Sequence, residues 1–251
     1  MTSQAYEQVL QRDPGFVPSL LNLARVDAEE GKPDVARQRL MRLFDTRKDD
    51  ARVMYELGLL AQREGNMVEA IDWLRKAAAK QPDEPRAALA LVELLAAPRQ
   101  PSAALNAAKE VGLRHPGNLQ VQAVLGQAYL AAGDATAARQ TFRDMTRLAE
   151  FDPDAQVRIG QLQLSAGYPD DAEYNIQKAL TAVKAYPPAL SLAVDVALAR
   201  GDVAAARTAL AGLAAAALGA GAGQALALLV AGSGAGGDYG PAGPDGAVPL
   251  T

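Results

Sequence analysis

The chain has 251 residues, of which 49% are apolar and 22% charged, and its formal net charge is -4 at pH 7. This composition supplies ample apolar surface for a folded core, and the small negative charge gives no general electrostatic footprint for nucleic acid. The sequence contains no cysteine, which excludes disulfides, thiol catalysis and the common zinc sites.

A step of 34 residues recurs along the chain. Alanine stands at each step, at Ala36, Ala70, Ala104, Ala138, Ala172 and Ala206. Glycine keeps the same step at Gly31, Gly65, Gly133, Gly167 and Gly201, and Arg99 occupies the one slot without glycine. Self-similarity at this period is typical of stacked helical hairpins, because each hairpin must bury the same face on its neighbour. The sequence therefore predicts an all-α solenoid of helix-turn-helix repeats.

In chain order, residues 1–16 are predicted to form the second helix of a truncated repeat, on the apolar pattern of Ala5, Tyr6, Val9, Leu10 and Pro14. Six units follow over residues 17–218, starting at Val17, Ala51, Pro85, Leu119, Pro153 and Pro187. The first helix of each unit is predicted from apolar residues three, four and seven positions apart, which mark one helix face. The glycine row is predicted to end this helix in the left-handed conformation.

The alanine row is predicted to begin the second helix of each unit. A large apolar residue stands four positions later, at Leu40, Leu74, Phe142, Ile176 and Leu210, with Ala108 as the weak case. The small residue is expected to let the two helices approach closely, and the larger one to fill the layer between hairpins. The third unit carries Pro98, Arg99 and Pro101 at its turn, which predicts a distorted hairpin.

Residues 219–251 are rich in glycine, alanine and proline, and we expect a tail of low order there. The tail contains G-x-G-x-x-G at Gly232, Gly234 and Gly237, but too few residues follow for the βαβ unit of a dinucleotide site. The uncharged stretch over residues 208–237 is mostly alanine and glycine, so it is interpreted as the last repeat plus the tail and not as a membrane span. The chain is expected to be a piece of a longer repeat protein.

The repeats resemble the tetratricopeptide repeat (TPR) family, whose pattern is W-x2-L-G-x2-Y followed by A-x3-F. The best matches are Met54-x2-Leu57-Gly58-x2-Ala61 and Gln122-x2-Leu125-Gly126-x2-Tyr129. The resemblance spans roughly residues 2–218 and implies a right-handed α-solenoid that binds proteins. More narrowly, units such as LLNLARVDAEEGKPDVARQRL resemble the TPR lipoproteins of bacterial exosortase (PEP-CTERM) exopolysaccharide systems. That resemblance implies the cell envelope if the chain belongs to a longer exported protein, and the cytoplasm otherwise.

The family resemblance assigns the concave, partner-binding surface to the first helices, at positions two, five, nine and twelve of each unit. The candidate partner-binding residues are Arg25, Arg52, Tyr55, Arg86, Glu93, Gln127, Gln161 and Asp195. Arginines at the early positions and Asp154 and Asp195 at the later ones predict a charge gradient that orients an extended peptide. The alternative is that these are ordinary solvated side chains.

The sequence favours a protein-interaction scaffold or adaptor with a protein or peptide partner and no nucleic acid, metal or cofactor. The single histidine, His115, is predicted to be a solvated turn residue, and Trp73, Tyr129 and Phe142 are predicted to be core. No catalytic residue is predicted. The alternative function is an accessory module of a larger enzyme or secretion assembly that lies outside this fragment. Uncapped apolar ends predict weak self-association.

Overall fold

The computed structural model describes residues 3–96 and 101–218. Within these ranges the chain forms thirteen α-helices and no strand, as the sequence predicts. The helices group into two compact units, divided after Leu148. The first unit holds α1 (Ser3–Arg12), α2 (Val17–Glu29), α3 (Pro33–Thr46), α4 (Ala51–Arg63), α5 (Met67–Lys80), α6 (Arg86–Leu95), α7 (Pro101–Arg114), α8 (Leu119–Ala131) and α9 (Ala135–Leu148). The second holds α10 (Pro153–Ser165), α11 (Pro169–Ala182), α12 (Pro187–Ala199) and α13 (Val203–Leu218).

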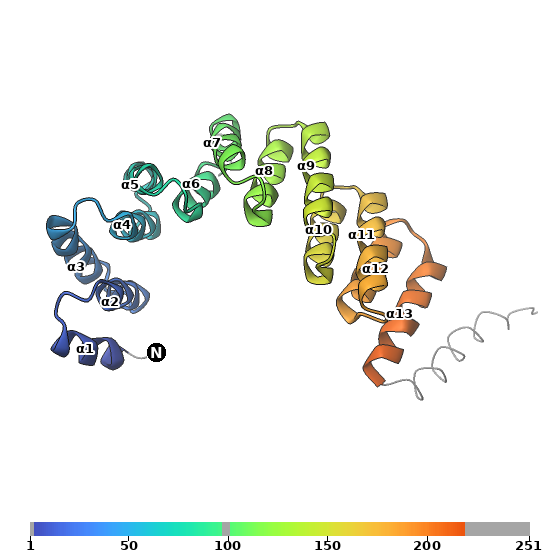
Figure 1. Ribbon diagram of the computed structural model, residues 1–251, viewed down its shortest axis with the longest axis horizontal. Helices are drawn as coiled ribbons and strands as arrows, with labels where there is room; N and C mark the ends of the chain where they lie inside the picture. The colour runs from blue at the N-terminus through green and yellow to red at the C-terminus, as the bar shows by residue number, and fades with distance from the viewer. Residues whose placement is uncertain (1–2, 97–100, 219–251) are drawn as a thin grey trace, which may run out of the picture. The chain divides into compact units, whose positions relative to one another are not determined.

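In the first unit, each helix packs on the next one along the chain, and α2 also contacts α4 as α6 contacts α8. Figure 1 shows α2, α4 and α6 along the inner side of this unit and α3, α5 and α7 along its outer side. The hairpins therefore stack in sequence order, with the first helix of each hairpin facing inward.

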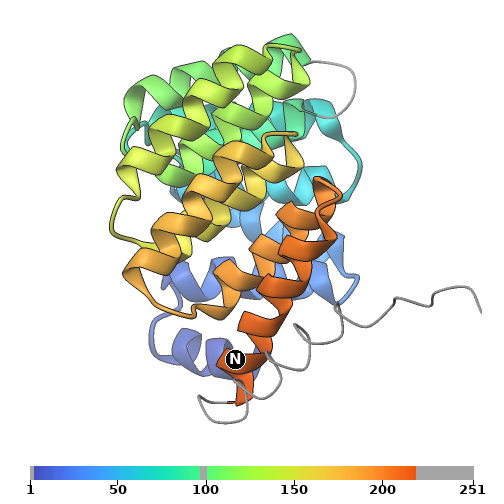
Figure 2. The same ribbon diagram turned by 90° about the vertical axis from the view of Figure 1, so that its right-hand side faces the viewer.

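In the second unit, α10 pairs with α11 and α12 with α13, and the two hairpins join through α10, α11 and α12. Helices α12 and α13 lie side by side in both views (Figures 1 and 2). No helix of the described ranges is long and apolar enough to cross a membrane.

The glycine row ends the first helices, as predicted. Gly31, Gly65, Gly133, Gly167 and Gly201 all have φ between 72° and 82°. At Gly133 the backbone N–H donates to the carbonyl of Leu130, and the N–H of Asp134 donates to the carbonyl of Tyr129. This is the Schellman arrangement, which satisfies carbonyls that a helix end leaves unpaired, and the same pair of bonds recurs at the other four glycines.

The alanine row does not begin the second helices, so this part of the prediction is wrong. Each second helix starts three residues earlier, and the alanine lies in its first turn. Local chemistry explains the earlier start: Asn66 caps α5 by accepting a hydrogen bond from the Glu69 N–H, and Pro33 and Pro169 occupy first positions where no N–H is needed. The six alanines are nevertheless buried, with at most 4% of their surface exposed.

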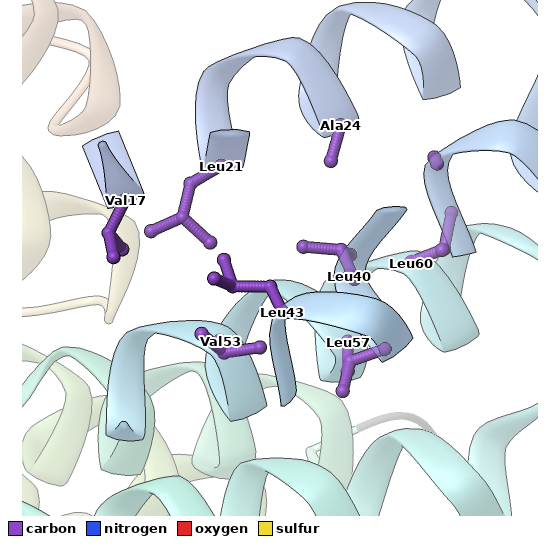
Figure 3. Close-up of a cluster of buried hydrophobic side chains, with 9 residues drawn as sticks. Val17, Leu21, Ala24, Leu40, Leu43, Val53, Leu57 and Leu60 are labelled. Carbon is purple, nitrogen blue, oxygen red and sulfur yellow. The ribbon is translucent and has the colours of Figure 1, made fainter. Parts of the chain in front are cut away.

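The large residues four positions after the alanines fill the layers between helices, with one exception. Leu74 and Phe142 are fully buried, whereas Leu210 is 50% exposed. The expectation for Leu210 is wrong because α13 packs on α12 and no later helix among the described residues covers its other side. Figure 3 shows how such a layer is built, with Val17 and Leu21 of α2 meeting Leu43 of α3 and Val53 of α4. Burying side chains of this size contributes about 1.5–3 kcal/mol each.

The hairpin of the third unit has a short first helix. Helix α6 has 10 residues, whereas α2, α4, α8, α10 and α12 have 13 each. The predicted distortion at Pro98 and Arg99 lies outside the described residues, as do the glycine motif and the tail over residues 219–251.

Candidate partner-binding groove

A hollow of about 370 Å³ opens on the inner side of the first unit, between α2, α4 and the start of α6. Its lining includes small and apolar residues, among them Leu21, Ala77 and Ala87, and several charged side chains. Four of the predicted site residues line it together: Arg25, Arg52, Tyr55 and Arg86. They converge because α2, α4 and α6 stack in register, which places equivalent positions of successive repeats side by side.

Arg86 and Tyr55 form a stacked pair across two repeats. The guanidinium carbon of Arg86 lies 4.5 Å from the centre of the Tyr55 ring, within the range of a cation–π interaction. Within the described ranges, Arg86 has no carboxylate partner at ion-pair distance. Its charge therefore remains available to a ligand.

Arg25 and Arg52, in contrast, are engaged within the protein. Arg25 donates to the buried Glu56 carboxylate at 2.6 Å, and this hydrogen bond raises the pKa of Arg25. Arg52 donates through two nitrogens to both oxygens of Asp50, at 3.0 and 2.7 Å. That bidentate contact lowers the pKa of Asp50 and raises the pKa of Arg52.

The early groove thus contains carboxylates as well as the arginines that the sequence pattern selected. The hollow is lined by three arginines and also by Glu56 and Glu84, neither of which the sequence pattern selected. Glu56 lies outside the four positions assigned to the concave face, and Glu84 lies in the turn before α6. A search for carboxylates about 31 residues after each groove arginine would have found Glu56.

A second hollow of about 410 Å³ adjoins the first and shares Tyr55, Glu84 and Arg86 with it. Its lining also includes Leu89 and Glu93 of α6 and Gln120 of α8. The groove therefore continues from α2 to α8, and Glu93 belongs to it together with the four residues named above.

The other predicted residues lie apart from these hollows. Gln127 is exposed on α8 of the first unit, and Gln161 and Asp195 are exposed on α10 and α12 of the second. Asp154 accepts a hydrogen bond from the Tyr186 hydroxyl, which raises the pKa of that tyrosine. Because the basic and acidic positions fall in different units, the charge gradient stays a prediction.

The histidine and the aromatic residues that the sequence analysis singled out lie in turns or pack against other side chains. His115 lies in the turn after α7, and its Nε2 atom is 3.1 Å from the carbonyl oxygen of Pro82. Phe142 is buried, while Trp73 and Tyr129 are half-buried. Over the described ranges, no group of three or more His, Cys, Asp or Glu residues is placed to hold a metal ion.

Family models place the chain among known repeats. Two models of the tetratricopeptide repeat match residues 21–85 and 95–158, together just over half of the sequence. The chain belongs to the tetratricopeptide repeat family. As a TPR array it is a scaffold for protein interaction. No curated protein matches the chain at a significant level.

Solved structures share the fold of this TPR chain. PilW, a widely conserved type IV pilus biogenesis factor, is 16% identical, with 82% of this chain and 96% of PilW covered at a TM-score of 0.54. PilF of Pseudomonas aeruginosa is 18% identical, with 89% and 99% covered at 0.54. A tetratricopeptide repeat protein from Parabacteroides merdae is 12% identical, with 91% of each chain covered at 0.54. At these identities the likeness concerns the fold alone.

Proposed function

We propose that this TPR array is a non-catalytic adaptor that binds an extended segment of a partner protein along the groove of α2, α4 and α6. The proposal rests on the Arg86 guanidinium, which lies where the two hollows adjoin. It stacks on Tyr55 and has no carboxylate partner within the described ranges. A guanidinium that is held in place by an aromatic ring and has no counterion can donate hydrogen bonds to a ligand carboxylate.

The remaining groove residues indicate what flanks that carboxylate. Leu21 and Ala87 in the lining offer apolar contact to a side chain of the ligand. Glu84, which lines both hollows, and Glu93, which lines the second, complement a cationic residue. Arg25 and Arg52 are already paired with carboxylates of the protein. They therefore shape the groove and are not free to bind a ligand carboxylate. The preferred ligand is a segment with an acidic residue beside an apolar one.

The test uses photo-crosslinking from the groove. A photoreactive phenylalanine analogue replaces Tyr55 in one protein and the exposed Tyr174 of the second unit in a control protein. We expect a specific adduct from position 55 alone, lost when Arg52→Glu and Arg86→Glu are combined with the crosslinker. The charge-matched control combines Lys184→Glu and Arg207→Glu, two exposed residues of the second unit. Adducts that persist with the groove variant, or appear equally from position 174, would count against the groove.

For the process served, we propose bacterial exopolysaccharide export or PEP-CTERM protein sorting, supported by the likeness of the repeat units to the TPR lipoproteins of those systems. The alternative, an accessory module of a larger enzyme or secretion assembly, predicts a different loss. Deleting the gene is expected to reduce secreted polysaccharide or the surface delivery of PEP-CTERM proteins. Unchanged levels of both would favour the alternative.

We also propose weak self-association through apolar surface at the array ends. On α13, Leu210 and Leu218 are 50% and 59% exposed, and on α1 Val9 is 38% exposed. Sedimentation velocity at rising concentration is expected to show a larger average coefficient, and Leu210→Lys with Leu218→Lys is expected to reduce the increase. A coefficient independent of concentration would refute this proposal.

A further inference from the structure

We propose that the outer side of the first unit carries a second binding surface, which seats an aromatic side chain of an acidic partner segment. The surface is a hollow of about 690 Å³ between the turn after α1, helix α2 and helix α3. Leu20, Val35 and Leu43 supply its apolar lining, and Arg39, Arg42 and Arg47 supply its charges. It shares no residue with the inner groove, so it stands independently of the function proposed above.

The repeat register shows what fits this hollow. One repeat later, the position of Arg39 is occupied by Trp73, whose ring meets Phe44 edge to face with centroids 5.0 Å apart and planes at 80°. Those two rings pack with the buried Met54 and Ala77, the equivalents of Leu20 and Leu43. In that repeat, the chain itself supplies the aromatic side chains that fill the layer.

Two repeats later, the hollow is open again. A cavity of about 520 Å³ lies there, lined by Ala88, Ala103, Ala107 and Val111, which are the equivalents of Leu20, Val35, Arg39 and Leu43. Among these three repeats, the place is therefore filled where the chain carries Trp73 and open where Arg39 or Ala107 stands instead. An aromatic side chain from a partner would take the place in the first repeat that the indole takes in the second.

The charged side chains of the first hollow indicate which class of partner can bind there. Arg39 pairs with Asp27 at 3.0 Å, but Arg42 and Arg47 have no carboxylate at ion-pair distance among the described residues. No carboxylate lines this hollow. In the equivalent hollow two repeats later, Glu110 stands in place of Arg42 and is paired with Arg114 at 2.7 Å, so one of the two arginines that line that hollow is already neutralised. The first hollow is thus complementary to carboxylates, which guanidinium groups bind in bidentate geometry.

The partner of this surface is a protein segment with one aromatic residue flanked by acidic residues. The ring would lie on Leu20 and Leu43, and the flanking carboxylates would pair with Arg42 and Arg47. Aromatic anchors in apolar pockets supply most of the affinity in many interfaces, while the charges around them set specificity and the rate of association.

A peptide selection tests this proposal. A phage-displayed library of random 12-residue peptides is selected on the wild-type protein and depleted on the variant that combines Arg42→Glu and Arg47→Glu. We expect the recovered peptides to carry an aromatic residue next to at least two acidic ones. Fluorescence anisotropy is expected to show binding weakened about tenfold or more by the double variant, in the range of a lost interfacial charge pair.

A second variant tests the contribution of the apolar lining to peptide binding separately from that of Arg42 and Arg47. Arg39→Trp fills the hollow with an indole, as in the next repeat, and keeps Arg42 and Arg47. It is expected to weaken the peptides about tenfold, while Lys184→Glu with Arg207→Glu and Arg52→Glu with Arg86→Glu leave binding within about twofold. Circular dichroism and urea midpoints verify folding of each variant. Failure to recover such peptides, or wild-type affinity in Arg39→Trp, would overturn the proposal.

Discussion

At the scale of the residue, the absence of a side chain at Gly126 decides how closely two helices approach. A Cβ added at Gly126 of α8 would meet the edge of the buried Phe142 ring of α9, with Cζ at 2.9 Å. Gly58 stands in the same way against Leu74, at 2.8 Å. These glycines occupy the same position of their units. The absence of a side chain on the first helix therefore makes room for a large side chain on the second.

We expect Gly126→Ala to destabilise the protein by about 1–3 kcal/mol, because the added methyl overpacks a core without free space. Urea unfolding followed by circular dichroism measures this change. The double variant Gly126→Ala with Phe142→Leu is expected to lose less than the sum of the single changes, since the smaller side chain relieves the contact. Strict additivity would show that the ring is not the obstacle.

Glu69 is the centre of a polar network on the outer side of the first unit. Its carboxylate accepts hydrogen bonds from Arg37 of α3, at 2.7 and 3.1 Å, and one from the indole nitrogen of Trp73 at 3.2 Å. The contact with Arg37 lowers the pKa of Glu69 below its ordinary value of 4.5. Because the pKa is lower in the folded state, ionised Glu69 stabilises the fold above that ordinary value.

This contribution is expected to disappear as the pH falls from 4.5 through the lower folded-state pKa. Glu69→Gln should therefore be less stable than the wild type at pH 7, and the difference should shrink on acidification. Urea midpoints at pH 7, 4 and 2 measure it. Asp72→Asn, which removes only an exposed pair with Lys76, is the control and is expected to have a small effect. A constant difference across the series would contradict the linkage.

At the scale of the element, the left-handed glycine makes each hairpin possible. Gly133 has φ 82° and open space around the position of a Cβ, so only its backbone conformation restricts substitution. Gly117, in the turn between α7 and α8, also has open space but no left-handed backbone. The two glycines therefore differ in backbone conformation and not in packing, so comparing them isolates conformational strain.

We expect Gly133→Ala to cost about 1 kcal/mol, since a Cβ disfavours the left-handed conformation. Gly117→Ala is expected to be neutral or to stabilise by about 0.4–1 kcal/mol, because it restricts the unfolded chain. Thermal unfolding by calorimetry compares the two. Equal losses in both variants would argue against strain at the turn.

At the scale of the whole molecule, equivalent residues of different repeats contribute differently to the free energy of unfolding, because their burial depends on where the repeat lies in the array. Ile176 of α11 and Leu210 of α13 are equivalent, yet Ile176 is 1% exposed and Leu210 is 50% exposed. Helix α11 is covered by α12, whereas α13 has contact with α12 on one side. Stability in such arrays depends on the interface between neighbouring repeats.

Ile176→Ala is therefore expected to cost about 2–5 kcal/mol, and Leu210→Ala less than about 0.5 kcal/mol. Both residues belong to the second unit, which makes them a matched pair. Urea unfolding measures the two changes. A large loss at Leu210 would indicate that its side chain is covered in solution.

Much of the fold could be predicted from the sequence because the forces that build it are local and periodic. The rows through Ala70 and Gly65 predicted the hairpins, and the family resemblance assigned Tyr55 and Arg86 to the inward face of the first helices, where both line one groove. The start of the second helices was missed, because caps such as Asn66 and not the alanines determine where those helices begin.

The site was predicted less completely, because its chemistry depends on side chains from different repeats. Glu56 neutralises Arg25 across 31 residues, and Glu84 enters the groove from a turn that carries no helical period. The sequence pattern did not predict the outer hollow at Arg42. This hollow is open because Arg39 stands where the next repeat has Trp73. The effect of that difference becomes visible only in the packing between neighbouring helices.

The helical hairpin, its 34-residue step and the turn glycines follow from the order of the amino acids alone, since backbone hydrogen bonds and left-handed conformations involve residues close in the chain. The pairing of each arginine, the hollows that stay open and the exposure of Leu210 become known only from the folded chain. Burial and ion pairing depend on what packs against a side chain, and equivalent positions of a repeat have different neighbours.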